Sequence, residues 1–199
     1  MRLHFGAIPL PTDFTPDVSW KPLRQPSPWI ALFVAFPIGI VAAGVVAGLW
    51  LAMTPLQVHD VTSALSLRGL LVSVAGMVVV HELIHVAVHP MSGRSPDTIV
   101  GIGGPTTGIY AHYDGEMTRN RFVAILLAPL VVISFVPLLV AAVAQASWGW
   151  VAFISSFNAF GACMDILDAG LILFQIPATA IVRQPGLRIY WREHETSAA

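Results

Sequence analysis

Two histidines and a glutamate in the segment His81-Glu82-Leu83-Ile84-His85 are the residues best suited to carry chemistry. On a helix, His81 and His85 lie one turn apart on the same face and can share a metal ion, while Glu82 beside them is a candidate general base. The residues on either side are apolar, as in a helix that faces lipid. Ionisable side chains in such surroundings must be paired, metal-bound or hydrated, so this spacing predicts a functional metal site.

A catalytic zinc site usually has three protein ligands, so a third ligand is needed. The chain has one cysteine, which leaves histidines and carboxylates as candidates. With a rise of about 1.5 Å per residue, His89 lies about 12 Å from His81 along a helix axis, too far to share an ion. We expect His89 to be a polar residue at the helix end. The remaining histidines are expected at the surface: His4, His59, His112 and His194.

Two aspartates in a later apolar run, residues 148–177, can supply the missing ligand. If this run and the run that carries His81 cross the membrane in the same direction, helix rise places Asp165 at the depth of His85. Asp168 lies one turn further along nearly the same face. We predict that the zinc ligands are His81, His85 and Asp165. Asp168 remains an alternative ligand or a residue that supports the ligands.

The composition predicts an integral membrane protein. Of 199 residues, 56% are hydrophobic and 11% are charged, against about 25% charged in soluble domains, and the mean hydropathy is +0.75. Four apolar runs are close to the roughly 20 residues that a spanning helix needs. They are residues 29–53, 68–89, 121–145 and 148–177. The predicted fold class is an all-α membrane protein with four transmembrane helices.

Arginine and lysine are concentrated in the first 28 residues, in the central loop and in the tail. By the positive-inside rule, both termini and the central loop are cytoplasmic in the cell membrane. We expect a proline-rich cytosolic arm over residues 1–28, with a short strand near its start. A four-helix membrane domain over 29–177 and a cytosolic tail over 178–199 follow. The net charge of −1 and the single lysine, Lys21, offer no basic surface for nucleic acid.

The central loop contains an element of its own. Residues 98–113 mix β-forming residues with glycines, and Asp114-Gly115 is a strong turn signal. This pattern predicts a small β-hairpin on the cytoplasmic side, between the second and third membrane helices. Its glycines match neither a dinucleotide-binding nor a P-loop fingerprint, which argues against a nucleotide site.

The order of motifs between residues 78 and 190 resembles the putative zincin peptidase family of small bacterial membrane proteins. More distantly, it is similar to the site-2 protease family of intramembrane metalloproteases. The matching features are His-Glu-Leu-Ile-His, Tyr113-Asp114-Gly115-Glu116 after a glycine-rich stretch, Ala128-Pro129, the cluster Asn158, Gly161 and Asp165, and Pro177. In site-2 proteases the third zinc ligand is an Asp followed by Gly. Here Ile166 follows Asp165, and Asp168-Ala169-Gly170 only approximates the pair, so the choice of acid stays open.

The resemblance implies an intramembrane zinc metallopeptidase that hydrolyses peptide bonds of membrane-anchored proteins, with Zn²⁺ as cofactor and Glu82 as general base. Asn158 is expected to contact the substrate or the oxyanion, or else to form an interhelical hydrogen bond. Pro129 and Pro137 are expected to kink the third helix or to serve packing. The partners would be a membrane-anchored protein or peptide and the lipid bilayer, not nucleic acid. Two alternatives stay open: a membrane protein that binds or transports metal, and a catalytically inactive scaffold.

Overall fold

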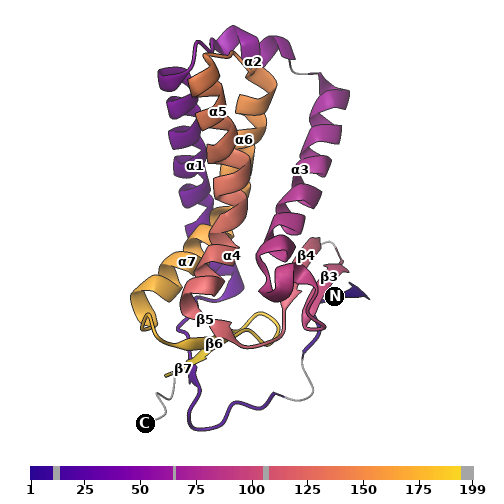
Figure 1. The fold of residues 1–199 in the computed structure, drawn as a ribbon, viewed down its shortest axis with the longest axis vertical. Helices are drawn as coiled ribbons and strands as arrows, with labels where there is room; N and C mark the ends of the chain where they lie inside the picture. Colours follow the sequence, from indigo (N-terminus) through magenta and orange to yellow (C-terminus); the bar gives the residue numbers. More distant parts are fainter. Residues whose placement is uncertain (11–13, 65, 105–107, 194–199) are drawn as a thin grey trace. The chain divides into compact units, whose positions relative to one another are not determined.

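The computed structural model describes residues 1–10, 14–64, 66–104 and 108–193, and the chain divides into two compact units. Unit 1 comprises Met1–Ser27, His85–Leu126 and Asp168–Ala199. Unit 2 comprises Pro28–Ile84 and Leu127–Leu167. Neither unit is continuous in sequence, and several helices begin in one unit and end in the other. Figure 1 labels the elements in chain order.

Unit 2 consists of apolar helices packed on one another. Its helices are α1 (Pro28–Met53), α2 (Val58–Ala64), most of α3 (Leu67–Val88), α5 (Val136–Ala144) and α6 (Gly149–Gly161). Helix α1 packs along α6, and α2 and α5 also contact α6 (Figure 1). Trp50 and Val46 of α1 and Leu138 of α5 are buried in the core of these helices.

The close approach of α1 to the end of α6 depends on Gly39. A Cβ at this position would lie 2.8 Å from the backbone oxygen of Phe160 and 3.1 Å from the Cβ of Cys163. Gly44 and Gly48, on the same helix, have nothing within 4 Å of a Cβ. Gly39 is therefore the glycine of α1 that allows tight packing.

The last apolar run is bent, not straight. Helix α7 (Cys163–Gln175) follows α6 after a bend of 49°, so the single helix expected over 148–177 is two helices. Gly161 is the last residue of α6, and glycine is a weak helix former. The bend places Asp165 in the first turn of α7, where the positive end of the helix dipole stabilises a carboxylate.

The third apolar run contains a π-helical segment. Helix α4 (Arg119–Pro129) continues into η2 (Leu130–Phe135) and then into α5, and Arg119–Ala144 counts as one candidate span. Pro129 ends α4 and Pro137 lies in the first turn of α5. Single π-turns within α-helices occur frequently at functional sites.

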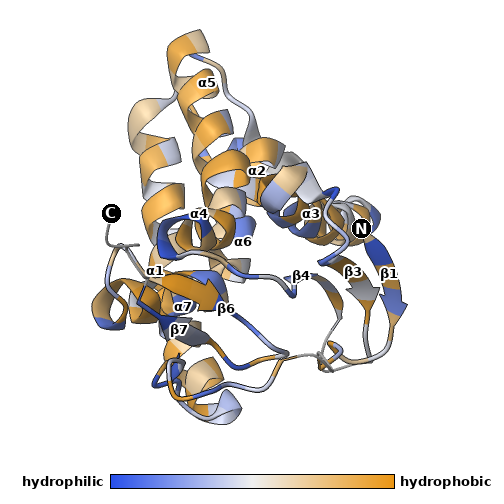
Figure 2. Ribbon diagram, turned by 60° about the horizontal axis from the view of Figure 1, so that its bottom comes forward, coloured by the Kyte–Doolittle hydropathy of each residue, from blue (hydrophilic) through white to orange (hydrophobic). Residues whose placement is uncertain are grey.

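Among the described residues, three helices are long and apolar enough to cross a membrane: Pro28–Met53, Leu67–Val88 and Arg119–Ala144. The bent pair α6 and α7 makes a fourth if it is one span. Large apolar side chains such as Trp29, Phe33 and Val143 are exposed on these helices. Figure 2 shows apolar residues along most of α1 and α5. These features are compatible with a membrane protein.

Unit 1 contains two small sheets, so the fold is mostly helical, with more strands than the single hairpin that was expected beside the helices. The first sheet has the order β1-β3-β4, with β1 (Arg2–Phe5) parallel to β3 (Thr98–Ile102) and β3 antiparallel to β4 (Ile109–Tyr113). The predicted hairpin between the second and third long helices is thereby confirmed. Residues 105–107, between β3 and β4 in the sequence, lie outside the described residues.

The second sheet was not predicted. Its order is β2-β7-β6-β5, formed by β2 (Lys21–Pro22), β7 (Tyr190–Arg192), β6 (Ile181–Arg183) and β5 (Met117–Thr118). Strands of two or three residues give too short an alternation to be recognised. Leu23, Val182 and Ile189 are buried together with Ile172 of α7 and form the core of unit 1.

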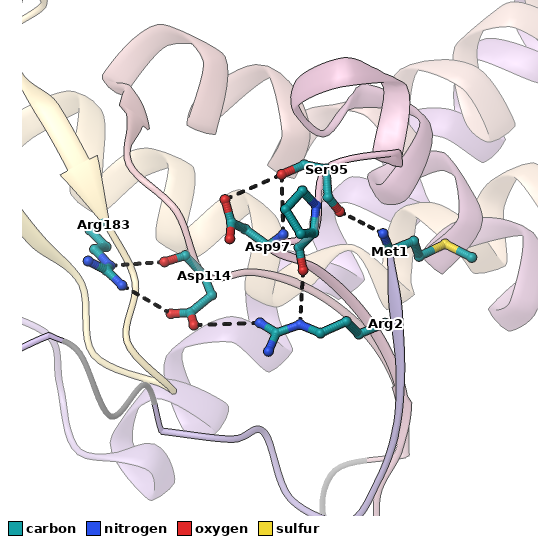
Figure 3. A network of polar contacts seen from close by, with 7 residues as sticks. Met1, Arg2, Ser95, Asp97, Asp114 and Arg183 are labelled. Atoms are coloured by element: carbon teal, nitrogen blue, oxygen red, sulfur yellow. Dashed lines mark hydrogen bonds and ion pairs between the residues drawn. The ribbon is translucent and has the colours of Figure 1, made fainter.

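A polar network joins β1, the hairpin and β6 within unit 1 (Figure 3). The amino group of Met1 donates to the carbonyl of Ser95 at 2.7 Å. The Asp114 carboxylate forms ion pairs with Arg183 at 3.7 Å and Arg2 at 3.9 Å. Arg183 also donates to the Asp114 carbonyl at 2.9 Å. Asp114, predicted as a turn residue, thus connects three segments that are distant in sequence.

Candidate metal centre

His81, His85 and Asp165 form a group that could hold a metal ion. Each offers one ligand atom, and these atoms all lie within 4.8 Å of one another. Both histidines come from α3, with 9% and 7% of their surface exposed, and Asp165 comes from the first turn of α7. In the described part of the chain, this is the one such group of histidine, cysteine and acidic residues.

The hydrogen bonds of His81 determine which of its nitrogens can bind a metal. Its Nδ1 lies 2.9 Å from Oδ1 of Asn158, whose Nδ2 donates to the carbonyl of Pro129 at 3.1 Å. A carbonyl only accepts, so the amide orientation of Asn158 is fixed and its Oδ1 must accept from Nδ1 of His81. In the neutral ring, Nε2 of His81 then carries a lone pair.

The Nε2 lone pair of His81 faces Oδ2 of Asp165 at 3.2 Å. Two acceptor atoms at this separation need a proton or a metal ion between them. Two ligands of a tetrahedral zinc ion are about 3.3 Å apart, since the Zn–N and Zn–O bonds are about 2.0–2.1 Å long. The observed distance therefore fits a shared zinc ion.

His85 is oriented in the same way by a backbone group. Its Nδ1 lies 2.8 Å from the carbonyl oxygen of Ile125 on α4. Because this oxygen cannot donate, Nδ1 of His85 carries the proton, and Nε2 carries the lone pair with which a neutral imidazole can bind a metal ion. Both histidines are thus held in the tautomer that can bind a metal ion through Nε2.

Helix α4 also holds the carboxyl end of α3. One guanidinium nitrogen of Arg121 donates to the carbonyls of Val88 and His89, each at 3.0 Å. The last carbonyls of a helix have no partner within the helix, and a basic side chain there satisfies them. Arg121 and Ile125 therefore fix the end of α3 that carries His85.

Glu82 and Asp168 are half-buried, and their expected roles stay predictions. Glu82 follows His81 directly on α3, as the motif requires. Asp168 lies in α7 one turn after Asp165, and it is not a member of the group of possible ligands. The structure thus brings Asp165, not Asp168, to the two histidines.

Asn158 is completely buried, and its amide group is fully engaged. Besides His81 and Pro129, it contacts the hydroxyl of Ser134 at 3.0 Å, which in turn donates to the carbonyl of Ser155 at 2.7 Å. This arrangement favours the interhelical hydrogen bond that was the alternative for Asn158. The Ser134 and Ile125 contacts were missed, since neither residue has a recognisable motif.

Two further histidines are buried near the hairpin. His89 is 2% exposed and His112 is 3% exposed, whereas His112 was expected at the surface. Burial lowers the pKa of each to about 4. His59 is exposed and His4 half-buried, and His194 lies outside the described residues. Neither His89 nor His112 joins the metal group, in agreement with the prediction for His89.

Two histidines one helical turn apart and a carboxylate from another helix are a ligand set of the kind found in zinc metallopeptidases, and Glu82 has the place of their general base. Residues 74–181 match the DUF3267 family, described as "Putative zincin peptidase". This match covers more than half of the chain, and the protein belongs to this family. No curated protein and no solved structure matches the chain. The family implies zinc as the metal, in agreement with the predicted cofactor.

Proposed function

We propose that the protein is an intramembrane zinc metallopeptidase. The observation that carries the proposal is the convergence of one possible ligand atom each from His81, His85 and Asp165, with the Nδ1 atoms of both histidines held by acceptors. The motif lies in a helix that is long and apolar enough to cross a membrane. We infer that substrates are membrane-anchored proteins or peptides.

His81, His85 and Asp165 would hold the zinc ion. When bound, zinc polarises the scissile carbonyl and lowers the pKa of water. Glu82 accepts the proton of the attacking water and delivers it to the leaving amine. Asn158 and the Ile125 carbonyl keep the two imidazole rings oriented throughout the reaction.

The hairpin offers a surface for an extended substrate. In the described part of the chain, β4 lies at the end of the strand order β1-β3-β4, because β1 occupies the other side of β3. A substrate segment unwound from its helix could pair with this edge by strand addition, which satisfies its backbone groups. With the termini and the hairpin on the cytoplasmic side, as the distribution of arginine and lysine predicts, cleavage would release a cytoplasmic fragment.

The test is Glu82→Gln, which keeps the size of the side chain and removes the base. Cells that carry the wild type or the variant are compared by labelling the new amino termini of membrane proteins. We expect amino termini that depend on the wild type, and cleavage lower by about 10²–10⁴-fold in the variant, with zinc retained. Equal cleavage by both proteins would remove Glu82 from the chemistry.

The wild type and Glu82→Gln also distinguish a peptidase from a metal transporter and from an inactive scaffold. A metal transporter would show zinc flux into vesicles that survives Glu82→Gln, with no difference in amino termini. An inactive scaffold would show neither flux nor cleavage. Either result would overturn the peptidase proposal.

A further inference from the structure

The helical run of α4, η2 and α5 contains a proline on each side of η2. Proline lacks a backbone N–H, and its ring crowds the carbonyl four residues earlier and pushes it away from the helix axis. For Pro129 this is the carbonyl of Ile125, which thereby loses its ordinary helical donor and becomes available to a side chain from another helix. For Pro137 the carbonyl four residues earlier is that of Ile133, but Ile133 lies in η2, where Val136 donates to Val131, five residues earlier.

Both of these carbonyls accept a side-chain hydrogen bond. The Ile125 oxygen accepts from Nδ1 of His85 at 2.8 Å, and the Ile133 oxygen accepts from the hydroxyl of Ser155 at 3.1 Å. Of the two, the Ile125 carbonyl is the one that contacts a predicted metal ligand, and it lies outside η2 in the α-helical part of the run.

We propose that Pro129 is a positioning residue for the metal centre. By removing the donor that would compete for the Ile125 carbonyl, it directs that oxygen to His85. His85 then carries its proton on Nδ1 and presents the Nε2 lone pair to the metal. The part of this inference that concerns zinc rests on the proposed function, whereas the tautomer of His85 does not.

Pro129 also acts on the other histidine. Its own carbonyl accepts from Nδ2 of Asn158, and this contact fixes the amide whose oxygen holds Nδ1 of His81. Pro129 therefore affects both imidazole rings. Its missing N–H leaves the Ile125 carbonyl to His85, and its own carbonyl orients Asn158 toward His81. The segment η2 begins directly after it, where the helical hydrogen-bond pattern changes.

A purely mechanical role for the proline predicts something different. If proline only bends the helix, Pro129 and Pro137 should be equivalent, because both lie in the same run. In the positioning role, Pro129→Ala restores an N–H that competes for the Ile125 carbonyl, while Pro137→Ala restores one in the first turn of α5, which cannot reach this carbonyl. The Ile125 oxygen has two lone pairs and can accept from both donors. In Pro129→Ala we therefore expect a weaker preference of His85 for the Nδ1-H tautomer, not a complete loss of the hydrogen bond.

The first readout is the tautomer of His85 in the metal-free protein. Long-range ¹H–¹⁵N spectra of the full chain in detergent distinguish a proton on Nδ1 from one on Nε2, with His85→Gln to assign the signals. We expect the Nδ1-H form in the wild type and in Pro137→Ala, and a mixture of both forms in Pro129→Ala. The Nε2-H form in the wild type would overturn the inference without any variant.

The second readout is zinc affinity, measured by competition with a chelator. Residues that orient a metal ligand typically change affinity by about 10–100-fold, and we expect a loss of this size in Pro129→Ala. Pro137→Ala should stay within about threefold of the wild type. Replacing Pro129 by the α-hydroxy acid analogue of alanine, which has no N–H, should restore most of the affinity.

The outcomes separate this inference from the proposed function. Unchanged tautomer and affinity in Pro129→Ala, or an equal loss in Pro137→Ala, would overturn the positioning role. A wild type that binds no zinc would overturn the proposed function, while a change of tautomer in Pro129→Ala would still support the role of Pro129.

Discussion

The Nδ1 atoms of His81 and His85 are each held by an oxygen that can only accept from them, one from a side chain and one from the backbone. The orientation of each ring is therefore set before a metal ion arrives. Asn158 and Ile125 therefore orient the metal ligands, although they are not metal ligands themselves.

Asn158→Ala should weaken zinc binding without abolishing it. The change leaves Nδ1 of His81, the Pro129 carbonyl and the Ser134 hydroxyl without their buried partner. We expect a loss of about 1–3 kcal/mol in the free energy of unfolding. Zinc affinity should fall by about 10–100-fold in a chelator titration. A substrate-contacting Asn158 would instead leave zinc affinity unchanged and alter only cleavage.

Asp165→Asn should abolish tight zinc binding, whereas Asp168→Asn should preserve it. Asparagine has nearly the same shape but lacks the charge that holds a divalent ion. Mutating a residue that only supports a metal ligand lowers metal affinity by about 10–100-fold. For the ligand itself, in Asp165→Asn, we expect zinc affinity to fall by more than about 100-fold. The two variants are matched controls for one another in the same titration. Loss of zinc binding in Asp168→Asn but not in Asp165→Asn would show that Asp168 is the ligand.

At the scale of elements, the bend between α6 and α7 places Asn158 and Asp165 on opposite nitrogens of the same imidazole ring. A single straight helix, as the apolar run suggested, would carry both residues on one continuous surface. Helix α1 supports the bend, since Gly39 packs on Phe160 and Cys163, which flank it.

Gly39→Ala should destabilise the protein, because its Cβ would meet the backbone oxygen of Phe160 at 2.8 Å. Overpacking of this kind costs about 1–3 kcal/mol. Gly44→Ala is the matched control on the same helix, and it should be neutral or stabilising by up to about 1 kcal/mol. Thermal unfolding in detergent checks both variants. Equal unfolding temperatures would refute close packing at Gly39.

At the scale of the whole molecule, stability should decrease in acid. The pKa of His112 is lowered by burial from 6.5 to about 4. Between these values the unfolded chain binds the proton and the folded chain does not, so stability present above pH 6.5 is lost as the pH falls toward 4.

His112→Gln should flatten this pH dependence. The variant has no imidazole to protonate, so its stability should fall by about 1–3 kcal/mol less than that of the wild type between pH 6.5 and 4. Denaturant unfolding at several pH values measures the difference. His59→Gln, at an exposed position, should leave the pH dependence unchanged. Parallel curves for His112→Gln and the wild type would contradict the burial of a neutral ring.

Much of the molecule could be predicted from its sequence, because the strongest signals are periodic or chemically distinctive. Long apolar runs predicted the helices, and the glycine-rich run with Asp114 predicted the hairpin. His81 and His85 followed from helical spacing, and Asp165 from helix rise. These inferences need only local geometry and one assumption about direction.

The remaining features depend on tertiary contacts that no local pattern encodes. The sheet β2-β7-β6-β5 joins strands of two or three residues from distant parts of the chain. His112 is buried because it lies on the same face of β4 as Tyr110, and this face is covered within unit 1. The partner of His85 is a backbone oxygen, and its one sequence signal is Pro129 four residues later.

The most direct test of the central claim is zinc K-edge X-ray absorption on the full chain loaded with one equivalent of zinc. We predict two imidazole nitrogens and additional oxygen ligands, with one imidazole lost in His81→Ala. A spectrum with fewer than two imidazoles in the wild type, or one unchanged in His81→Ala, would contradict the assignment of the metal centre.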